Sequence, residues 1–223
     1  MAIPIMILGE SGSGKSASMR ELDPRETLLI QSIRKPLPFK SSNWKQYSKD
    51  NKSGSIVYTD NWQHIIRAFT LANQLGRDKI VVDDFQYVLA NEFMRRATEK
   101  GFTKFTEIGH HAWSIFMAAQ NLPGNARIYI LSHTDTNDQG HTKAKTIGKL
   151  LDEKITVEGL FTIVLKSIVS DNTFSFSTQN SGNDTVKSPI GLFDSTLIDN
   201  NLSMIDREIC EYYELNKPTE AIA

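Results

Sequence analysis

The chain has 223 residues, of which 39% are hydrophobic and 23% charged, and its formal net charge is −1. This length and composition suit one α/β domain, and the near-zero charge excludes a global basic field for nucleic acid. The single cysteine, Cys210, excludes a disulfide framework or a cysteine zinc cluster within one chain, which is typical of a cytoplasmic protein.

The first element is an apolar run at residues 3–8 that predicts a buried strand and is too short for a signal peptide or a membrane span. It leads into GESGSGKS, the G-x-x-x-x-G-K-S pattern of a phosphate-binding loop, in which glycines let backbone N–H groups point at phosphate oxygens. A short helix beginning near Lys15 adds its positive end, and Pro24 stops it. We expect Lys15 to reach the β- and γ-phosphates and the Ser16 hydroxyl to ligate Mg²⁺. The predicted nucleotide-binding residues are Gly9, Glu10, Ser11, Gly12, Ser13, Gly14, Lys15, Ser16 and Ala17.

A second apolar run at residues 27–32 predicts another buried strand, and the segment after it, 33–52, is basic. Six lysines and arginines stand there against one acid, with three aromatic residues between them. Two interpretations are open. The segment either grips single-stranded DNA by charge and stacking, with Arg34 and Lys35 as contacts, or is a solvated connector whose aromatics pack on the body.

A helix capped by Asp60 or Asn61 and ended by Gly76 precedes the second informative site, KIVVDDF at residues 79–85. Carboxylates at the end of a parallel strand face the ligand crevice, as in a Walker B motif. Asp83 would hold Mg²⁺, and Asp84 would orient or deprotonate the attacking water. The alternative is that one of the two acids caps the next helix.

Helical patterns follow at 86–100 and 104–122, where we expect surface or packing roles for His110 and His111. The run RIYILSH at 127–133 then predicts a strand that places His133 in the same crevice as Asp83. His133 either bonds the γ-phosphate or the water, or is a core histidine paired with a neighbour.

Residues 134–152 form the longest polar, structure-poor stretch, and Lys143, Lys145 and Lys149 cluster in it without intervening acids. This pattern suits a loop that becomes ordered on a polymer ligand. Antiparallel strands are expected at 160–169 and 173–179, a last helix at 203–215, and a frayed tail from Pro218.

The order of these motifs, with KPLPF at 35–39 and VKSP at 186–189, resembles the phage RecA-like P-loop ATPases of the single-strand annealing recombinase class. The resemblance implies a RecA-like α/β core over residues 1–202, with a mostly parallel central sheet flanked by helices and a late antiparallel β-hairpin. A C-terminal helix and tail over 203–223 would complete the chain.

The resemblance also implies residue roles. His133 takes the place of the polar sensor of RecA-like proteins, 134–151 that of the mobile DNA-binding loop, and Lys187 that of lysines placed on a neighbour's ATP. The chain departs from the pattern where RecA carries a catalytic glutamate, because Gln31 or Ser32 stands there. Asp84 and Glu10 are therefore the candidate bases.

The leading hypothesis is an ATP- and Mg²⁺-dependent recombination or annealing protein that binds single-stranded DNA. It would hydrolyse ATP to ADP and phosphate, with stimulation by DNA, at a site shared between subunits of a homo-oligomeric ring or filament. Its expected setting is the cytoplasm, that of the host cell for a viral protein, with a single-strand-binding protein as a further partner and no membrane. The alternatives are an ATPase accessory of a replication or packaging machine, similar to a helicase loader, and a P-loop kinase. A kinase would need an arginine-bearing lid, whereas Arg207 is the one arginine of the late region.

Overall fold

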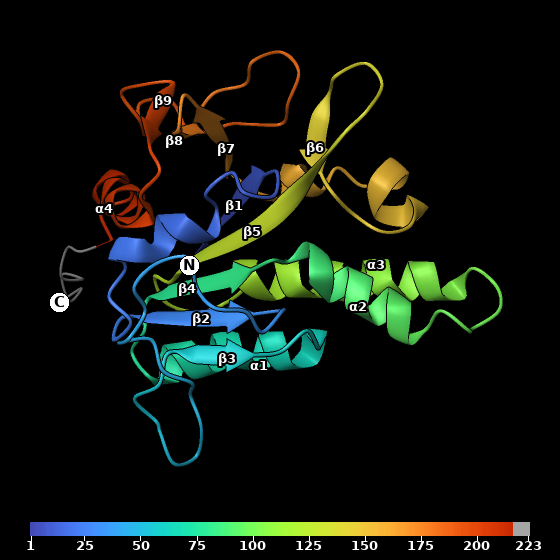
Figure 1. Cartoon of the computed structure of the whole chain (residues 1–223), viewed down its shortest axis with the longest axis horizontal. Coiled ribbons are helices and arrows are strands. Elements are labelled where there is room, and N and C mark those ends of the chain that lie inside the picture. Colours follow the sequence, from blue (N-terminus) through green and yellow to red (C-terminus); the bar gives the residue numbers. More distant parts are fainter. Residues whose placement is uncertain (216–223) are drawn as a thin grey trace, which may run out of the picture.

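The computed structural model describes residues 1–215, so the tail predicted from Pro218 lies outside the described residues. Within them a nine-stranded sheet runs in the order β3-β2-β4-β5-β1-β7-β8-β9, with β6 paired to β5 (Figure 1). The strands are β1 (Ile3–Gly9), β2 (Thr27–Gln31), β3 (Ile56–Tyr58), β4 (Lys79–Asp83), β5 (Arg127–Thr136), β6 (Thr142–Ala144), β7 (Ile163–Ser170), β8 (Thr173–Ser177) and β9 (Leu197–Asp199).

The six strands from β3 to β7 in this order are parallel, while β8 and β9 add antiparallel pairs at the far edge. The predicted fold class, a mostly parallel sheet with a late antiparallel hairpin, is therefore confirmed. Because β1, β4 and β5 are parallel neighbours, their carboxyl ends meet at one edge of the sheet. Gly9 is in register with His133 there.

Helices cover both faces of the sheet (Figure 1). One face carries α1 (Trp62–Gln74), α2 (Gln86–Arg95) and α3 (Thr103–Gln120), and the other carries the short 3₁₀ helix η1 (Ser16–Glu21) and α4 (Leu202–Tyr212). Alternate strand residues serve the two cores: Met6 and Leu8 of β1 pack toward α1–α3, and Ile5 and Ile7 toward η1 and α4. No helix among the described residues is long and apolar enough to cross a membrane.

The stretch 134–152 is not the structure-poor loop that its polarity predicts. β5 continues to Thr136 and pairs antiparallel with β6, with Thr134 opposite Ala144, and a π-helical turn (Leu150–Lys154) follows. The connection turns at Gly140, whose φ is +79° and whose N–H donates to the Asn137 carbonyl at 2.9 Å. The threonines in this stretch are compatible with strands, and the sequence NDQG at 137–140 is typical of a turn between them. The high polarity of the stretch favoured a loop prediction instead.

Other boundaries differ by a few residues. The helix predicted at 86–100 ends at Arg95, and β9 was not predicted. Asn61 caps α1 as expected, since its Oδ1 accepts from the His64 N–H at 3.0 Å. His111 packs between helices, with Nδ1 2.9 Å from Glu92 Oε1 and its ring stacked on Trp62, whereas His110 is exposed. The described residues contain no cluster of metal-ligating side chains around either histidine.

Candidate active site

The phosphate-binding loop connects β1 to η1 and holds Lys15 tightly. The Lys15 side chain donates from Nζ to the carbonyl oxygens of Gly9 at 2.8 Å and Glu10 at 2.7 Å. The residue is 5% exposed. Burial lowers the pKa of Lys15 to about 8, although Asp84 and Asp83 oppose the shift. The loop therefore fixes one ammonium group at the floor of the site.

Gly14 is required by both conformation and space. Its φ is +93°, which disfavours any L side chain, and an added Cβ would lie 2.7 Å from Phe174 Cδ1. The Phe174 ring comes from the start of β8 and is 43% exposed. An aromatic side chain from the late hairpin thus packs directly on the phosphate loop.

Ser16 and Asp83 form a set of oxygen donors that fits Mg²⁺. The Ser16 Oγ donates to Asp83 Oδ1 at 2.8 Å, while Asp83 Oδ2 has no hydrogen-bond partner among residues 1–215. Asp83 is 1% exposed. Burial and the neighbouring Asp84 raise the pKa of Asp83 to about 6, although the hydrogen bond from Ser16 acts to lower it. A buried carboxylate with a free oxygen beside a hydroxyl is what a hard cation requires. Ser16 and Asp83 would hold the ion beside the phosphates.

Asp84 binds two basic side chains. Its backbone has a φ of +59°, its Oδ2 is ion-paired with Lys35 Nζ, and His133 Nε2 lies 3.6 Å from its Oδ1. Burial would raise the pKa of Asp84, but the neighbouring His133 and Lys35 side chains outweigh it and hold the pKa below its ordinary value of 3.8. Asp84 does not cap α2, whose first turn receives no side-chain capping bond. The pairing makes Asp84 a weaker base than a free carboxylate.

Apart from the buried Asp83, which lies behind Ser16, these groups line one cavity of about 490 Å³ at the carboxyl edge of the sheet. Its walls are Ser11, Gly12, Gly14, Lys15, Ser16, Ala17, Lys35, Pro36, Pro38, Asp84, His133 and Phe174. A second cavity of about 450 Å³ adjoins it, shares Ser11 and His133, and includes Glu10, Tyr87 and Lys145. The His133 ring lies edge-on to Tyr87, with centroids 5.8 Å apart. His133 therefore stands between the two cavities.

The lysines predicted to contact DNA lie in different surroundings. Lys143 Nζ is 2.6 Å from Asp152 Oδ1, and Lys149 Nζ is 3.7 Å from Glu153 Oε1, so acids just beyond the cluster pair with both. Lys145 lines the second cavity.

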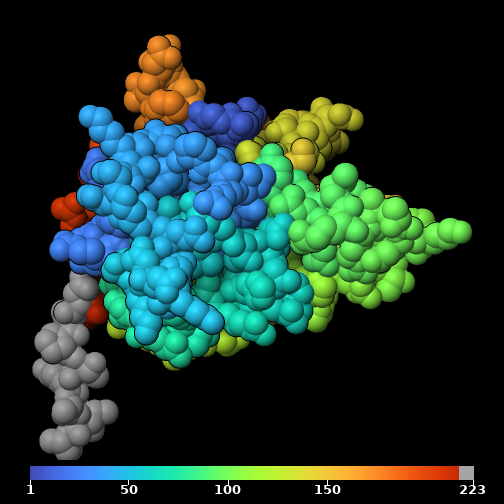
Figure 2. Space-filling view, turned by 60° about the horizontal axis from the view of Figure 1, so that its bottom comes forward, coloured from blue at the N-terminus to red at the C-terminus, as the bar shows by residue number. Residues whose placement is uncertain are grey.

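Arg34 and Lys35 belong to the segment 33–52, which forms a continuous part of the surface (light blue in Figure 2). Arg34 lies over the Tyr58 ring at 4.8 Å, whereas Lys35 enters the phosphate cavity. Trp44 is 8% exposed and packs in the core, with Phe39 edge-on to it at 6.2 Å. The packing of these two aromatics favours the connector interpretation over base stacking.

Two further predicted residues lie at the margins. Glu10 is exposed on the loop. Lys187 exchanges backbone hydrogen bonds of 2.8 and 2.9 Å with Val164 of β7, and it is not among the described residues that line the phosphate cavity. Its role in a neighbour's site stays a prediction.

Phe174 was not among the predicted site residues, and Lys35 lies in the phosphate cavity rather than on a DNA-contacting surface. Lys35 follows the end of β2 by four residues, at the edge where the phosphate loop lies, and that spacing was a usable signal. Phe174 follows a turn in which Asp171 and Asn172 both have positive φ, and the turn returns the chain over the loop.

The fold and this site together define a mostly parallel α/β sheet with a G-x-x-x-x-G-K-S loop at its carboxyl edge, in which β5 lies between the loop-bearing β1 and the acid-bearing β4. No protein-family model matches the chain, and no curated protein matches it. Among solved structures it is similar to a KaiC-like protein from the hyperthermophilic archaeon Pyrococcus horikoshii OT3. The identity is 12% and the TM-score 0.45, over 78% of this chain and 76% of that one. A similarity this weak supports no conclusion about function, and the fold assignment rests on the strand order.

Proposed function

We propose that this protein is a Mg²⁺-dependent ATPase whose turnover is coupled to single-stranded DNA. The observation that carries the proposal is the buried Asp83 carboxylate, which is bonded to Ser16 and has an unpaired oxygen beside the phosphate loop. A buried carboxylate oxygen without a hydrogen-bond partner is costly, so this arrangement is best explained by a cation that accompanies a nucleotide.

In the proposed reaction each side chain has a separate task. Lys15 and the loop N–H groups bind the β- and γ-phosphates, and Ser16 and Asp83 hold Mg²⁺, which neutralises phosphate charge when bound. Asp84 is held by Lys35 and His133, so it orients the attacking water more readily than it deprotonates it. A site without a strong base is expected to turn over slowly unless DNA improves its geometry.

The DNA part of the proposal is supported by the continuity of β5. The strand runs without a break from His133, on the wall of the phosphate cavity, to Thr136 and the hairpin with β6, which contains Lys143 and is followed by Lys145. A shift of His133 on nucleotide binding would therefore move the hairpin with it. We further propose that a second copy completes the site through Lys187 in a ring or filament.

Steady-state phosphate release with and without single-stranded DNA tests the proposal, with Lys15→Ala as the inactive variant. Lys49→Ala is a matched control, because Lys49 is exposed and lies far along the segment 33–52. We expect DNA-stimulated turnover in the wild type and the control, and none in Lys15→Ala. Phosphate transfer to a small acceptor would instead favour a kinase. ATP turnover indifferent to both would favour an accessory ATPase of a replication or packaging machine.

A further inference from the structure

Lys35 occupies the phosphate cavity although its segment belongs to the protein surface. It lies four residues beyond β2, and its carbonyl accepts from Gln31 Nε2 at 3.5 Å. Its Nζ is ion-paired with Asp84 Oδ2, and Lys35, Pro36 and Pro38 together form one wall of the cavity. Trp44, buried in the core, anchors the segment further along. The segment between β2 and the buried Trp44 therefore holds the Lys35 ammonium group in the cavity beside the phosphate loop.

The cavity is balanced in charge without a ligand. Lys15 and Lys35 stand against Asp83 and Asp84, and both carboxylates are almost fully buried at 1% and 4% exposure. A terminal phosphate would bring about two further negative charges toward Asp84. Negative charge added beside a buried carboxylate is unfavourable unless a cation lies between them.

Lys35 is the side chain best placed to supply that cation. Lys15, which contacts the phosphates from the loop side, donates to the Gly9 and Glu10 carbonyls rather than to Asp84. His133 lies near the other oxygen of Asp84, so Lys35 is the lysine that pairs with this carboxylate. The Lys35 side chain is 42% exposed, so it keeps freedom to move. Its ammonium has three donor hydrogens and can contact Asp84 and a phosphate oxygen at once.

We propose that Lys35 contacts the terminal phosphate of a bound nucleoside triphosphate and makes the site prefer triphosphate over diphosphate. The inference rests on the proposed nucleotide site and adds a specificity-determining residue to it. A diphosphate ends short of Asp84, so it would leave the Lys35–Asp84 ion pair as the structure shows it.

Titration calorimetry with MgADP and with the Mg²⁺ complex of β,γ-imido ATP tests this directly. Lys35→Gln is expected to weaken binding of the imido triphosphate about 10- to 150-fold, the range for one charge-assisted hydrogen bond, and to change MgADP binding less than about twofold. Lys35→Arg keeps the charge and should retain most of the preference. Lys40→Gln is the matched control, because Lys40 is exposed in the same segment.

The outcomes separate the inference from the function beneath it. If Lys35→Gln leaves both affinities unchanged, or lowers both equally, Lys35 does not read the terminal phosphate and the inference is overturned. Restored triphosphate affinity in the double variant Lys35→Gln/Asp84→Asn would also overturn it, because Lys35 would then act only as a counter-ion for Asp84. A wild-type protein that binds neither nucleotide would refute the proposed function itself.

Discussion

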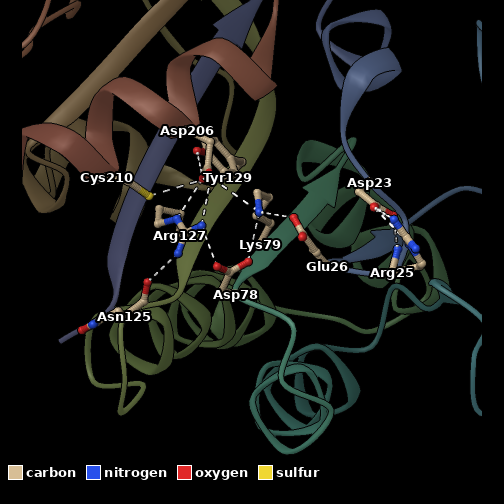
Figure 3. Close-up of polar contacts among 10 residues, drawn as sticks. All are labelled: Asp23, Arg25, Glu26, Asp78, Lys79, Asn125, Arg127, Tyr129, Asp206 and Cys210. Carbon is tan, nitrogen blue, oxygen red and sulfur yellow. Dashed lines mark hydrogen bonds and ion pairs between the residues drawn. The ribbon is translucent and has the colours of Figure 1, made fainter. Parts of the chain in front are cut away.

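The amino ends of β4 and β5 carry a buried ion-pair network whose removal should destabilise the fold without touching the nucleotide site (Figure 3). Asp206 of α4 accepts from Arg127 Nε at 2.8 Å and Nη2 at 2.9 Å, and from Tyr129 Oη at 2.6 Å. Arg127 is 3% exposed and Asp206 4%. Asp206→Asn would remove the buried negative charge that balances the Arg127 guanidinium.

The expected loss of unfolding free energy depends on the hydrogen bonds that Arg127 keeps in Asp206→Asn. Breaking a buried ion pair costs about 3–5 kcal/mol. The lower end applies because Arg127 also donates to Asp78 Oδ2 and to the Asn125 carbonyl, each at 2.9 Å. A loss of about 3 kcal/mol corresponds to a fall in Tm of roughly 6–12 °C for a chain of this size.

Thermal unfolding followed by circular dichroism measures this, with Glu211→Gln on the exposed side of α4 as control. The control should stay within about 0.5 kcal/mol of wild type. Nucleotide affinity of folded Asp206→Asn should be unchanged, because six residue steps along β5, about 20 Å, separate Arg127 from His133. Melting of Asp206→Asn within 2 °C of the control, a margin of about 1 kcal/mol, would refute the reasoning.

Three further predictions concern acid stability, the nucleobase and DNA. Burial would raise the pKa of Asp78, but Arg127 and Lys79 outweigh it and hold the pKa below the ordinary 3.8. The ionised Asp78 carboxylate therefore stabilises the fold above the unfolded-state pKa of 3.8, and this contribution is lost as the pH falls through the lower pKa of the folded state. The difference in unfolding free energy between wild type and Asp78→Asn, measured by urea titration, should narrow from pH 6 toward pH 3. Phe174 lines the phosphate cavity with a 43% exposed aromatic side chain, which could stack on the base of a bound nucleotide. Phe174→Ala should then weaken ATP binding by the roughly 1–3 kcal/mol typical of base stacking and leave inorganic tripolyphosphate binding unchanged, and equal losses for both would exclude a stacking role. Lys145→Gln should lower the salt dependence of DNA binding by about 0.7 per lost phosphate contact, more than Lys149→Gln, whose lysine is paired with Glu153.

The central sheet was predictable because its strands are short apolar runs that end in polar groups. KIVVD and RIYIL read as buried strands without knowledge of their neighbours, and their carboxyl ends placed Asp83 and His133 beside the phosphate loop. The hairpin β5–β6 was not predicted, because its threonines and lysines give no apolar alternation. Backbone pairing with β5 supplies its order instead, and no local pattern in residues 134–144 reveals that partner.

The site residues also differ in whether the sequence could predict them. The spacing of the loop fixed Lys15 and Ser16, since a short motif needs no tertiary information. Lys35 and Phe174 reach the cavity from segments that leave the sheet and return, so their positions depend on chain paths that composition does not specify. Basic composition assigned Lys35 to DNA, whereas the buried Asp84, just beyond the end of the neighbouring strand β4, pairs with Lys35 in the phosphate cavity.

This division also indicates where the protein should respond to its ligand. Asp83 ends β4, and Lys15 and Ser16 follow β1 at the start of η1, so all three adjoin buried strands in the middle of a close-packed sheet that shift little. Lys35 and Phe174 are about two-fifths exposed, and the hairpin beyond His133 extends past the sheet. Because the rigid groups bind phosphate and the half-exposed groups surround it, nucleotide-dependent change is expected in residues 33–38, at the β7–β8 turn and in the β5–β6 hairpin. Hydrogen exchange that slowed instead in the core of β1 and β4 on nucleotide binding, with these three segments unchanged, would contradict that division.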